Sequence, residues 1–527
     1  MVDLVHDLIV DSATETPDAE ALVHQGRRLS YADLATEVEK FAAGLIGLGI
    51  DRSERLAVYL EKRFEAVIAL FGATAAGGVF VPINPLLKPE QVTYILSDCN
   101  VRVLVTSVER LKLLIDVLPQ CHDLHAIIVV GSADERSTYT GLKVLTWGDV
   151  CASAELNKPY HCIDIDMAAI LYTSGSTGKP KGVVLSHRNI VVGAKSVSQY
   201  LENQSNDRIL SVLPLSFDYG LSQLTTAFLK GASVVLLEYL LPRDVINAVS
   251  KYKITGLAAV PPLWGQLADL EWPEAAKQSL RYFTNSGGAM PKAALEKLRQ
   301  SLPNTSPYLM YGLTEAFRST YLDPKELEQR PSSIGKAIPN AEILVINNRG
   351  EICKPNEEGE LVHRGVHVAM GYWNAPNKTA ERFKPVSHNE RPGLQTELAV
   401  WSGDRVKKDD AGFLYFVGRN DEMIKSSGYR ISPAEIEECL YQNSTVAEAI
   451  AFGVDDEKLG QRIRVVISPS VNNEKNNDEL LKDIFKYCKK SLPNFMQPHE
   501  IEIVEKLPRN ANGKIDRSLL KKMFLTV

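Results

Sequence analysis

The sequence predicts an α/β fold with a large N-terminal domain and a small α+β C-terminal domain. The large domain is expected to contain two α/β sheet subdomains and a β-rich subdomain. Three observations lead to this prediction. The chain has 527 residues, enough for several structural units. Strand and helix patterns alternate through the first 160 or so residues and again after residue 190. Short strands with glycine turns replace them after about residue 331.

The alternating regions contain apolar, β-branched runs that are typical of buried strands. Early examples are RLAVYL, VRVLVT and AIIVV, and ASVVLLE begins a second series. Strands that alternate with helices form mostly parallel, buried sheets. Residues 66–83 are uncharged, but Gly72, Gly77, Gly78 and Pro82 interrupt them. The run therefore favours a buried helix, a glycine turn and a buried strand over a membrane span.

A domain boundary is predicted near residue 420, where the polar stretch GRNDE follows the strand FLYFV. Pro433 and the acidic first turn at Glu435 predict that a helix begins just beyond it. The two domains are therefore expected to span residues 1–420 and 421–527.

Composition excludes several functional classes. The formal net charge of −6 argues against a protein whose main task is to neutralise a nucleic-acid backbone. The N-terminus lacks the basic and apolar segments of a signal peptide, so we expect a cytoplasmic protein. The seven cysteines show no CxxC or Cys/His spacing, which predicts neither a zinc site nor a disulfide framework.

A glycine-rich segment carries the strongest functional signal. LYTSGSTGKPKGVVLSH runs from Leu171 to His187, where an apolar strand leads into a loop of glycines, hydroxyl residues and two lysines. A triphosphate needs close backbone approach, N–H donors and positive charge, so we expect the phosphates of ATP here. The Walker A spacing is absent, and a solvated turn is the alternative for a generic loop of this composition. The predicted nucleotide-binding residues of the loop are Thr173, Ser174, Gly175, Ser176, Thr177, Gly178, Lys179 and Lys181.

With five further motifs, this loop resembles the ANL superfamily of adenylate-forming enzymes, which comprises acyl-CoA synthetases, adenylation domains of peptide synthetases and luciferases. The motifs occur in family order across nearly the whole chain. The resemblance implies an AMP-forming ligase that uses ATP and Mg²⁺, joins a carboxylic acid to AMP and passes the acyl group to a thiol. The further motifs are YGLTE at 311–315, GELVHRGVHVAMGYWN at 359–374, WSGD at 401–404, GRNDEMIKSSGYRISPAEIE at 418–437 and LPRNANGKIDR at 507–517.

The resemblance assigns roles around YGLTE. Glu315 is implied to hold Mg²⁺ on the phosphates, a task that suits a carboxylate. Thr314 is implied to donate a hydrogen bond to the α-phosphate, where charge builds up during the reaction. Tyr311 is implied to stack near adenine, with Gly312 beside it. A wall near the nucleotide is implied for Ser286, Gly287 and Gly288.

The remaining motifs imply a ribose site, a catalytic lysine and a hinge. Asp404 is implied to accept both ribose hydroxyls, with Arg419 as the neighbouring ribose or phosphate contact. Read alone, either residue could be an ordinary surface charge. Lys514 is implied to lie between the carboxylate and the α-phosphate during adenylation only. Asp421 falls at the hinge about which the small domain rotates, so that the segment around Gly428 faces the thiol donor afterwards.

The segment LPLSFDYGLSQL, residues 213–224, bears on the substrate. Its Phe217 and Asp218 resemble a pair in the adenylation domains of peptide synthetases, where the aspartate binds the α-ammonium group of an amino acid. A buried carboxylate needs a partner, and a substrate ammonium would supply one. With Lys514 for the carboxylate, Asp218 would recognise a zwitterion. The alternative is an aspartate that caps a helix beginning near Tyr219.

Within the superfamily, this segment is most similar to stand-alone L-proline adenylating enzymes, which load proline on a carrier protein in pathways to pyrrole-containing and related alkaloids. The predicted substrate is therefore L-proline or another small carboxylic acid. The predicted acceptor is the phosphopantetheine thiol of a separate carrier protein, because no carrier domain is recognised in the chain. A small apolar pocket suits a pyrrolidine ring. The predicted substrate-binding residues are Phe217, Asp218, Ser222, Met310, Phe317 and Lys514.

Other functions remain open on the sequence. The main alternative is an AMP-forming acyl-CoA synthetase that uses free CoA and an uncharged acid. A third is a non-catalytic sensor of AMP or an acyl-adenylate. The retention of Lys514, Glu315, Asp404 and the complete glycine-rich loop argues against such a sensor, and no residue favours a luciferase-like oxygenase.

Overall fold

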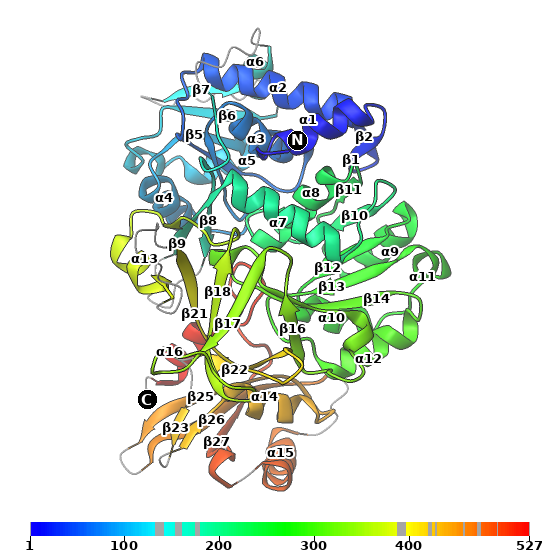
Figure 1. Ribbon diagram of the computed structural model, residues 1–527, viewed down its shortest axis with the longest axis vertical. Helices are drawn as coiled ribbons and strands as arrows, with labels where there is room; N and C mark the ends of the chain where they lie inside the picture. Colours follow the sequence, from blue (N-terminus) through cyan, green and yellow to red (C-terminus); the bar gives the residue numbers. More distant parts are fainter. Residues whose placement is uncertain are drawn as a thin grey trace.

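The computed structural model describes most of the chain and arranges it as a large N-terminal domain above a small C-terminal one (Figure 1). Three β-sheets organise the described residues, with helices packed around them. This is the mixed α/β architecture that the sequence predicts. The described residues are 2–131, 142–152, 161–173, 180–386, 397–419, 424–426, 429–456, 459–471, 476–492 and 494–525.

The first sheet has eight strands in the order β19-β9-β8-β4-β3-β5-β6-β7. Strands β3 to β8 run parallel, and β9 turns back antiparallel to β8. The strands are β3 (Arg55–Tyr59), β4 (Val79–Pro82), β5 (Val101–Ser107), β6 (Ala126–Val130), β7 (Lys143–Thr146), β8 (Met167–Thr173), β9 (Lys181–Ser186) and β19 (Gly371–Tyr372). Their helices are α2 (Tyr31–Gly47), α3 (Phe64–Ala75), α4 (Pro89–Asp98), α5 (Val108–Leu114) and α6 (Trp147–Cys151).

Alternate residues of these strands bury into two different apolar cores. Leu56 and Val58 of β3 join the core that contains α2 and α3, whereas Ala57 joins the core that contains α4 and α5. Successive side chains of a strand point to opposite faces, so a strand covered on both sides is apolar throughout. The uncharged run 66–83 is confirmed as a buried helix, a turn and a buried strand. Among the described residues, no helix is long and apolar enough to cross a membrane.

The second sheet has fourteen strands and spans the rest of the large domain. Strands β10 to β14 and β1 form its parallel part, and β14, β15 and β16 join that part to an antiparallel, β-rich part. The strands are β1 (Glu20–His24), β2 (Arg27–Ser30), β10 (Arg208–Ser211), β11 (Ser233–Leu236), β12 (Gly256–Ala259), β13 (Tyr282–Asn285), β14 (Ser306–Tyr311), β15 (Thr320–Leu322), β16 (Ser333–Ala337), β17 (Ala341–Ile346), β18 (Glu358–Gly365), β20 (Phe383–Pro385), β21 (Leu398–Lys408) and β22 (Leu414–Arg419).

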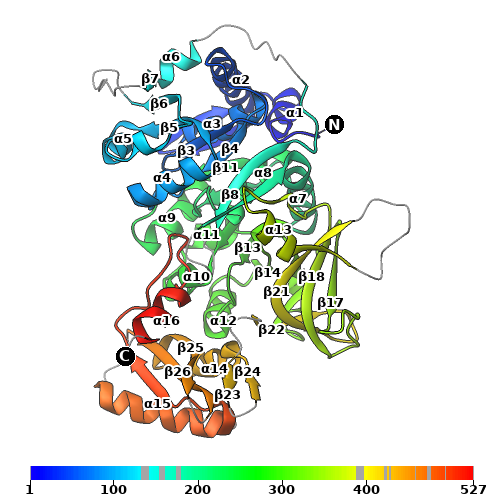
Figure 2. The ribbon, with the colours of Figure 1, turned by 90° about the vertical axis from the view of Figure 1, so that its left-hand side faces the viewer.

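Helices cover the parallel part of this sheet (Figures 1 and 2). They are α1 (Asp7–Glu15), α7 (His187–Tyr200), α8 (Asp218–Leu229), α9 (Pro242–Tyr252), α10 (Pro261–Ala268), α11 (Glu274–Ser279) and α12 (Lys292–Ser301), with α13 (Pro376–Arg382) beside β19 and β20. Sequence analysis assigned the first 160 residues to one sheet. In the structure β1 instead pairs with β11 of the second sheet, so the start of the chain contributes to both α/β units.

The small domain is built on a five-stranded sheet. The predicted boundary near residue 420 lies outside the described residues, which resume at β23. The predicted helix after Pro433 is confirmed, with the proline in its first turn. The elements are β23 (Ile424–Ser426), β24 (Tyr429–Ile431), β25 (Val446–Asp456), β26 (Gly460–Pro469) and β27 (Glu500–Ile503), with α14 (Pro433–Tyr441), α15 (Asn477–Ser491) and α16 (Arg517–Leu525).

Two buried histidines lie inside the large domain. His363 of β18 is fully buried, and its Nδ1 lies 3.0 Å from Ser319 Oγ. His367 is also fully buried, with Nε2 3.1 Å from Ser196 Oγ of α7. Burial lowers the pKa of His363 to about 3 and that of His367 to about 4. Both side chains are therefore neutral in the folded protein at neutral pH.

We expect the protein to lose stability as the pH falls from about 6.5 toward 4. The unfolded chain binds protons on these histidines near their usual pKa, whereas the folded chain does not, so acid favours unfolding. Urea unfolding at pH 7.5, 6.0 and 5.0 measures the effect. The variant His363→Gln should show a smaller loss, and His122→Gln, at an exposed position, should follow the unmodified protein. An unchanged pH dependence in His363→Gln would contradict the prediction.

Candidate active site

The predicted site residues gather at one edge of the large sheet. Strands β10, β12, β13 and β14 are parallel, so their carboxyl ends meet at the same edge. Phe217 follows β10, Ser286 directly follows β13, and YGLTE begins at the last residue of β14. In open α/β sheets, ligands bind at the carboxyl ends of the strands. The topology therefore assembles the motifs that the sequence separates by up to a hundred residues.

The small domain adds Lys514 to this edge. Its Nζ lies 5.3 Å from the centroid of the Phe217 ring, within the range of a cation–π contact. A side chain at Gly287 would meet Lys514, with a Cβ only 3.1 Å from its Cε and 3.6 Å from its Nζ. Gly287 also has φ +81°, so glycine suits this position for its backbone and for the space that it leaves. The structure thus brings Lys514 together with the predicted substrate and nucleotide walls.

The ends of the glycine-rich loop are fixed by a hairpin. Thr173, the last residue of β8, pairs with Lys181, the first residue of β9. Residues 174–179, which include most of the predicted phosphate-binding residues, lie outside the described residues. Lys181 Nζ lies 5.3 Å from the centroid of the Tyr372 ring, and the Tyr372 hydroxyl donates a 2.6 Å hydrogen bond to Glu315 Oε1. Glu315 is therefore held next to the base of the loop.

Positive charge is concentrated at this base. Burial, followed by the charges of Lys378 and Arg382, lowers the pKa of Lys181. Burial alone would also lower the pKa of Arg382, but the negative charges of Glu315 and Asp404 help to hold it above its usual value. Cations that repel one another in a partly buried site are stabilised by a bound anion. The surroundings of the loop thus suit a polyphosphate.

The WSGD motif forms a tight bulge that presents Asp404. Ser402 Oγ donates to the backbone oxygen of Leu361 and accepts from the Asp404 N–H, at 2.7 and 3.0 Å. Gly403 has φ +71°, and an added Cβ would lie 2.6 Å from Arg382 Nη1. Asp404 is buried and accepts a hydrogen bond from the Tyr311 hydroxyl.

The structure also relates Asp404 to the other predicted ribose contact. Asp404 of β21 pairs directly with Arg419 of β22, although the side chain of Arg419 is outside what the structure describes. Tyr311, predicted near adenine, has its ring 6.3 Å from that of Phe416 on β22. The predicted adenine and ribose residues therefore lie side by side, and the hinge prediction at Asp421 falls outside the described residues.

The carboxylate of Asp218 forms a buried ion pair with Arg318. The helix α8 begins at Asp218 with Phe217 as its N-cap and no side-chain capping bond, so Asp218 does not cap the helix. Its Oδ2 accepts a 2.5 Å hydrogen bond from Arg318 Nη1, and its Oδ1 accepts from Thr314 Oγ1 at 3.3 Å. The side chains of Asp218 and Arg318 are only 5% and 3% exposed. The partner that a buried carboxylate requires is thus already supplied by Arg318.

Phe317 connects this ion pair to the core. It has φ +54°, an unusual conformation for an aromatic residue, and its side chain is fully buried. The ring packs against Gly193 of α7, where an added Cβ would lie 2.4 Å from Phe317 Cδ1. Phe317 thus fills the core beside α7 while its neighbours Arg318 and Glu315 reach the site.

The remaining predicted substrate residues are also buried. Ser222 lies one helical turn after Asp218, on the same face of α8, and its hydroxyl has no hydrogen-bond partner among the described residues. The sulfur of Met310 on β14 accepts a 3.0 Å hydrogen bond from the Tyr200 hydroxyl. Arg318 Nε, like the Ser222 hydroxyl, is buried and makes no hydrogen bond within the described part of the chain. A polar group of a bound acid could bond at these two positions.

Two sequence-family profiles match the chain. The one described as AMP-binding enzyme matches residues 9–373, and the one described as AMP-binding enzyme C-terminal domain matches residues 435–514. The chain belongs to the AMP-binding enzyme family. The family is part of the ANL superfamily of adenylate-forming enzymes, as the motifs predict.

Relatives of this AMP-binding enzyme fall into two groups. Tyrocidine synthase 1 of Brevibacillus parabrevis is 29% identical over 99% of the chain, and the long-chain-fatty-acid–CoA ligase of Bacillus subtilis is 27% identical over 98%. The chain spans 94% of the CoA ligase but only 45% of tyrocidine synthase 1 and 8% of tyrocidine synthase 3 from the same organism. A solved anthranilate CoA ligase bound to anthranoyl-AMP is 25% identical, with a TM-score of 0.87 over 99% of this chain and 97% of that one.

ANL enzymes use ATP and Mg²⁺. The o-succinylbenzoate CoA synthetase of Bacillus subtilis, 26% identical with a TM-score of 0.80 over 98% of this chain and 99% of that one, was solved with both. Among the described residues of this AMP-binding enzyme, no three His, Cys, Asp or Glu side chains form a ready-made metal site. Mg²⁺ is usually held by one or two carboxylates together with substrate phosphates. A single Glu315 beside a cationic loop base fits that requirement.

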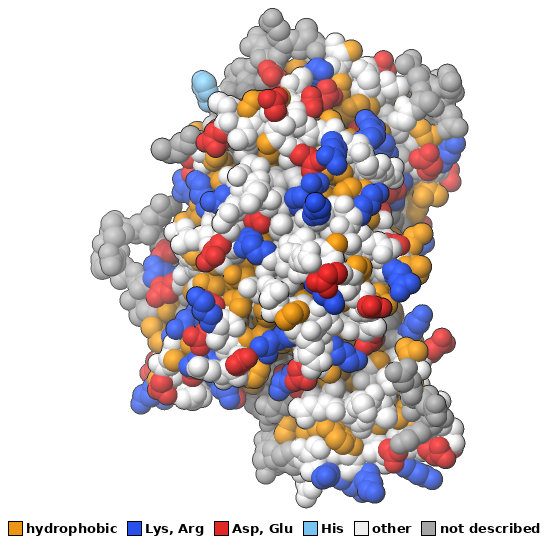
Figure 3. All heavy atoms as spheres, turned by 90° about the vertical axis from the view of Figure 1, so that its right-hand side faces the viewer, with side chains coloured by type: hydrophobic (Ala, Val, Ile, Leu, Met, Phe, Trp, Pro, Cys, Tyr) orange, Lys and Arg blue, Asp and Glu red, His pale blue; other side chains and the backbone are white. Residues whose placement is uncertain are grey.

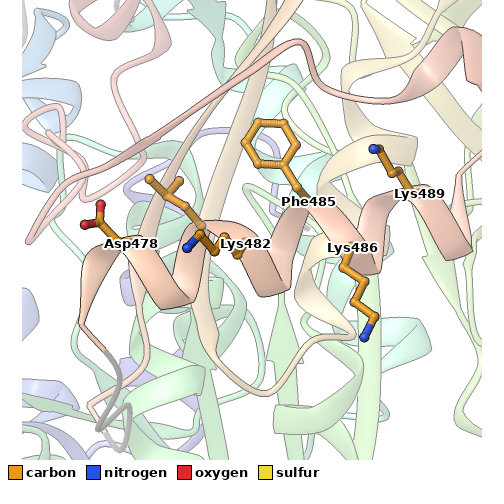
Figure 4. A pocket seen from close by; sticks show the side chains of 6 residues that line it. Asp478, Lys482, Phe485, Lys486 and Lys489 are labelled. Carbon is orange, nitrogen blue, oxygen red and sulfur yellow. The ribbon is translucent and has the colours of Figure 1, made fainter.

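The hollow on the small domain does not involve the predicted site residues. A hollow of about 640 Å³ lies along α15 of the small domain (Figure 4), but none of the predicted site residues lines it. On the face shown in Figure 3, basic and acidic side chains are interspersed, without a continuous basic surface. The hollow is lined by Asp478, Leu481, Lys482, Phe485, Lys486 and Lys489.

Sequence analysis missed several residues of the site in this AMP-binding enzyme. Arg318 follows YGLTE by three residues, and its position just after that motif was the available signal. Tyr372 lies in a motif that was quoted without a role for it. Arg382 lies in no recognised motif, so only the fold reveals its position.

We expect the variant Gly193→Ala to reduce the rate of adenylation at least tenfold. The added Cβ would push against the Phe317 ring, which cannot move without shifting Arg318 and Glu315, and overpacking a core is costly. ATP/pyrophosphate exchange measures the rate. Gly265→Ala on α10 is the matched control, because an added Cβ there has no neighbour within 4 Å. Equal exchange rates in the two variants would sink the idea that the Phe317 packing positions the site.

Proposed function

We propose that this ligase adenylates a carboxylic acid at the carboxyl edge of the large sheet and transfers the acyl group to a thiol. An oxygen of the acid attacks the α-phosphorus of ATP, and pyrophosphate leaves. A thiol sulfur then attacks the acyl carbon, and AMP leaves. The proximity of Lys514 to both Phe217 and Gly287 supports this proposal, because it places one cation between the predicted acid and nucleotide sites.

Individual roles follow from the geometry. Lys181 and Arg382 hold phosphate oxygens at the base of the glycine-rich loop, and Glu315 is the carboxylate available to Mg²⁺. When bound, the metal neutralises charge on the phosphates. Asp404, oriented by the WSGD bulge, accepts hydrogen bonds from the ribose hydroxyls. Thr314 lies between Glu315 and Asp218, where its hydroxyl can exchange a bond to Asp218 for one to the α-phosphate.

The acid that the geometry favours is uncharged beyond its carboxylate, with free CoA as the acceptor. The observation that carries this choice is the buried ion pair of Asp218 and Arg318. A neutral pair offers no unpaired negative charge to an ammonium group, and a second buried cation beside Arg318 would be costly. The long-chain-fatty-acid–CoA ligase, which this chain matches along nearly its full length, supports the same choice.

The second candidate is L-proline, or another amino acid, with the phosphopantetheine thiol of a separate carrier protein as acceptor. The position of Asp218 beside Phe217 favours it, as does the similarity to tyrocidine synthases 1 and 3. In this candidate the substrate amine shares the Asp218 carboxylate with Arg318. Asp218 then binds the substrate directly, whereas in the first candidate it only neutralises the charge of Arg318.

The double variant Asp218→Asn with Arg318→Gln separates the two candidates. Either single variant leaves one buried charge unpaired, which costs about 3–5 kcal/mol in comparable pairs, so both should lose exchange activity. If the pair is structural, the neutral double variant should recover exchange to within about tenfold of the unmodified protein, because only hydrogen-bonded amides remain.

The measurement is ATP/pyrophosphate exchange with the twenty amino acids and with short, medium and aromatic acids. Exchange with uncharged acids, recovered in the double variant, is the expected result. Exchange with L-proline alone, lost in the double variant as in Asp218→Asn, would make the second candidate the function. Thermal unfolding of each variant shows whether a loss reflects instability.

A further inference from the structure

The lysine of the small domain is carried on a rigid hairpin. Arg509 and Ile515 form an antiparallel bridge at its base. Within it, Asn510 N–H donates to the Lys514 oxygen at 2.8 Å, and Asn510 Oδ1 accepts from the Lys514 N–H at 3.1 Å. Arg509 Nη1 donates to the Gly513 oxygen at 2.8 Å, and Arg509 Nη2 pairs with Glu448 of β25. Bonds within the small domain therefore help to order the hairpin.

The hairpin extends out of the small domain into the large one. Figure 2 shows this red segment, which precedes α16, rising above the small domain toward the large sheets. Its tip meets Asn84, which follows β4 of the first sheet. Asn84 Nδ2 donates to the Ala511 oxygen at 2.7 Å and to Asn512 Oδ1 at 3.3 Å. Asn84 is only 5% exposed, whereas Ala511 and Asn512 are half-buried, so both bonds are partly shielded from water.

The two ends of the Asn84 amide have separate tasks. Its Oδ1 accepts a 2.9 Å hydrogen bond from the Leu86 N–H, which closes the local turn of the large domain. Within the described part of the chain, its Nδ2 donates to the hairpin of the small domain alone. One side chain thus both shapes its own loop and holds the loop that carries Lys514.

We propose that Asn84 is a positioning residue that holds Lys514 in place for adenylation. This inference rests on the proposed function, in which Lys514 acts only in the first half-reaction. Each hydrogen bond from Asn84 to the hairpin favours the arrangement in which Lys514 reaches Phe217. Any rotation of the small domain that withdraws Lys514 must break these bonds, so they oppose the arrangement used for thiol transfer.

The variant Asn84→Asp isolates this role. It keeps Oδ1 for the Leu86 N–H but replaces the donor with an acceptor that faces two other acceptors, the Ala511 oxygen and Asn512 Oδ1. We expect ATP/pyrophosphate exchange to fall about tenfold, since one lost hydrogen bond is worth up to about that factor. Transfer from a separately prepared acyl-adenylate to pantetheine, the arm common to both candidate acceptors, should proceed at an unchanged or higher rate.

Two further variants complete the experiment. Lys514→Ala should abolish exchange and preserve transfer, which checks the proposed function itself. Asn100→Asp is the matched control, because Asn100 Nδ2 donates to Asp123 within the large domain and the hairpin is not involved. It should leave the ratio of the two half-reactions unchanged.

The outcomes are distinguishable. Loss of exchange with retained transfer in Asn84→Asp supports the positioning role. An equal decrease in both half-reactions, or a ratio like that of Asn100→Asp, would overturn it. Full exchange in Lys514→Ala would instead refute the role proposed for Lys514, whatever Asn84→Asp does.

Discussion

The buried pair of Asp218 and Arg318 is the interaction on which the rest of the site depends. It joins the start of α8 to the segment after β14, two parts of the chain that are a hundred residues apart. Taking two charges out of water is costly, so the pair persists only because both groups are hydrogen-bonded and the surrounding core is closed. Phe317 and Gly193 supply that closure. The positions of Thr314 and Glu315 follow from it, since both lie in the same short segment.

The neutral pair of Asp218 and Arg318 also bears on which substrates the proposed site can select. Lys181, Lys378 and Arg382 lie together near the carboxylates of Glu315 and Glu381 at the predicted nucleotide end, whereas Asp218 and Arg318 form a balanced pair at the predicted acid end. The two ends are joined by Lys514, which comes from another domain. In the proposed function, the cations for phosphate therefore belong to the large domain, whereas the cation for the reacting carboxylate belongs to the small one.

Sequence analysis predicted the fold class, the buried helix and strand over residues 66–83 and the helix after Pro433, because local apolar patterns and proline positions determine them. It could not predict that β1 joins the second sheet, since strand pairing is a long-range choice. In the site, motif residues such as Asp404 and Lys514 stay predictions, although the structure brings Lys514 next to Phe217 and Gly287. The partner of Asp218 could not be named in advance, because Arg318 is distant in sequence and its role exists only after α8 and β14 are packed together.

The pairing of β1 with β11 also has a consequence for synthesis of the chain. Leu22 pairs with Val234, so the partner of β1 is made 212 residues later (234 − 22). At ribosomal rates of about 5–20 residues per second, the hairpin of β1 and β2 waits roughly 10–40 s with an unsatisfied edge. An unpaired strand edge is a template for association with other chains. The nascent protein therefore passes through a period in which shielding by chaperones would protect its yield.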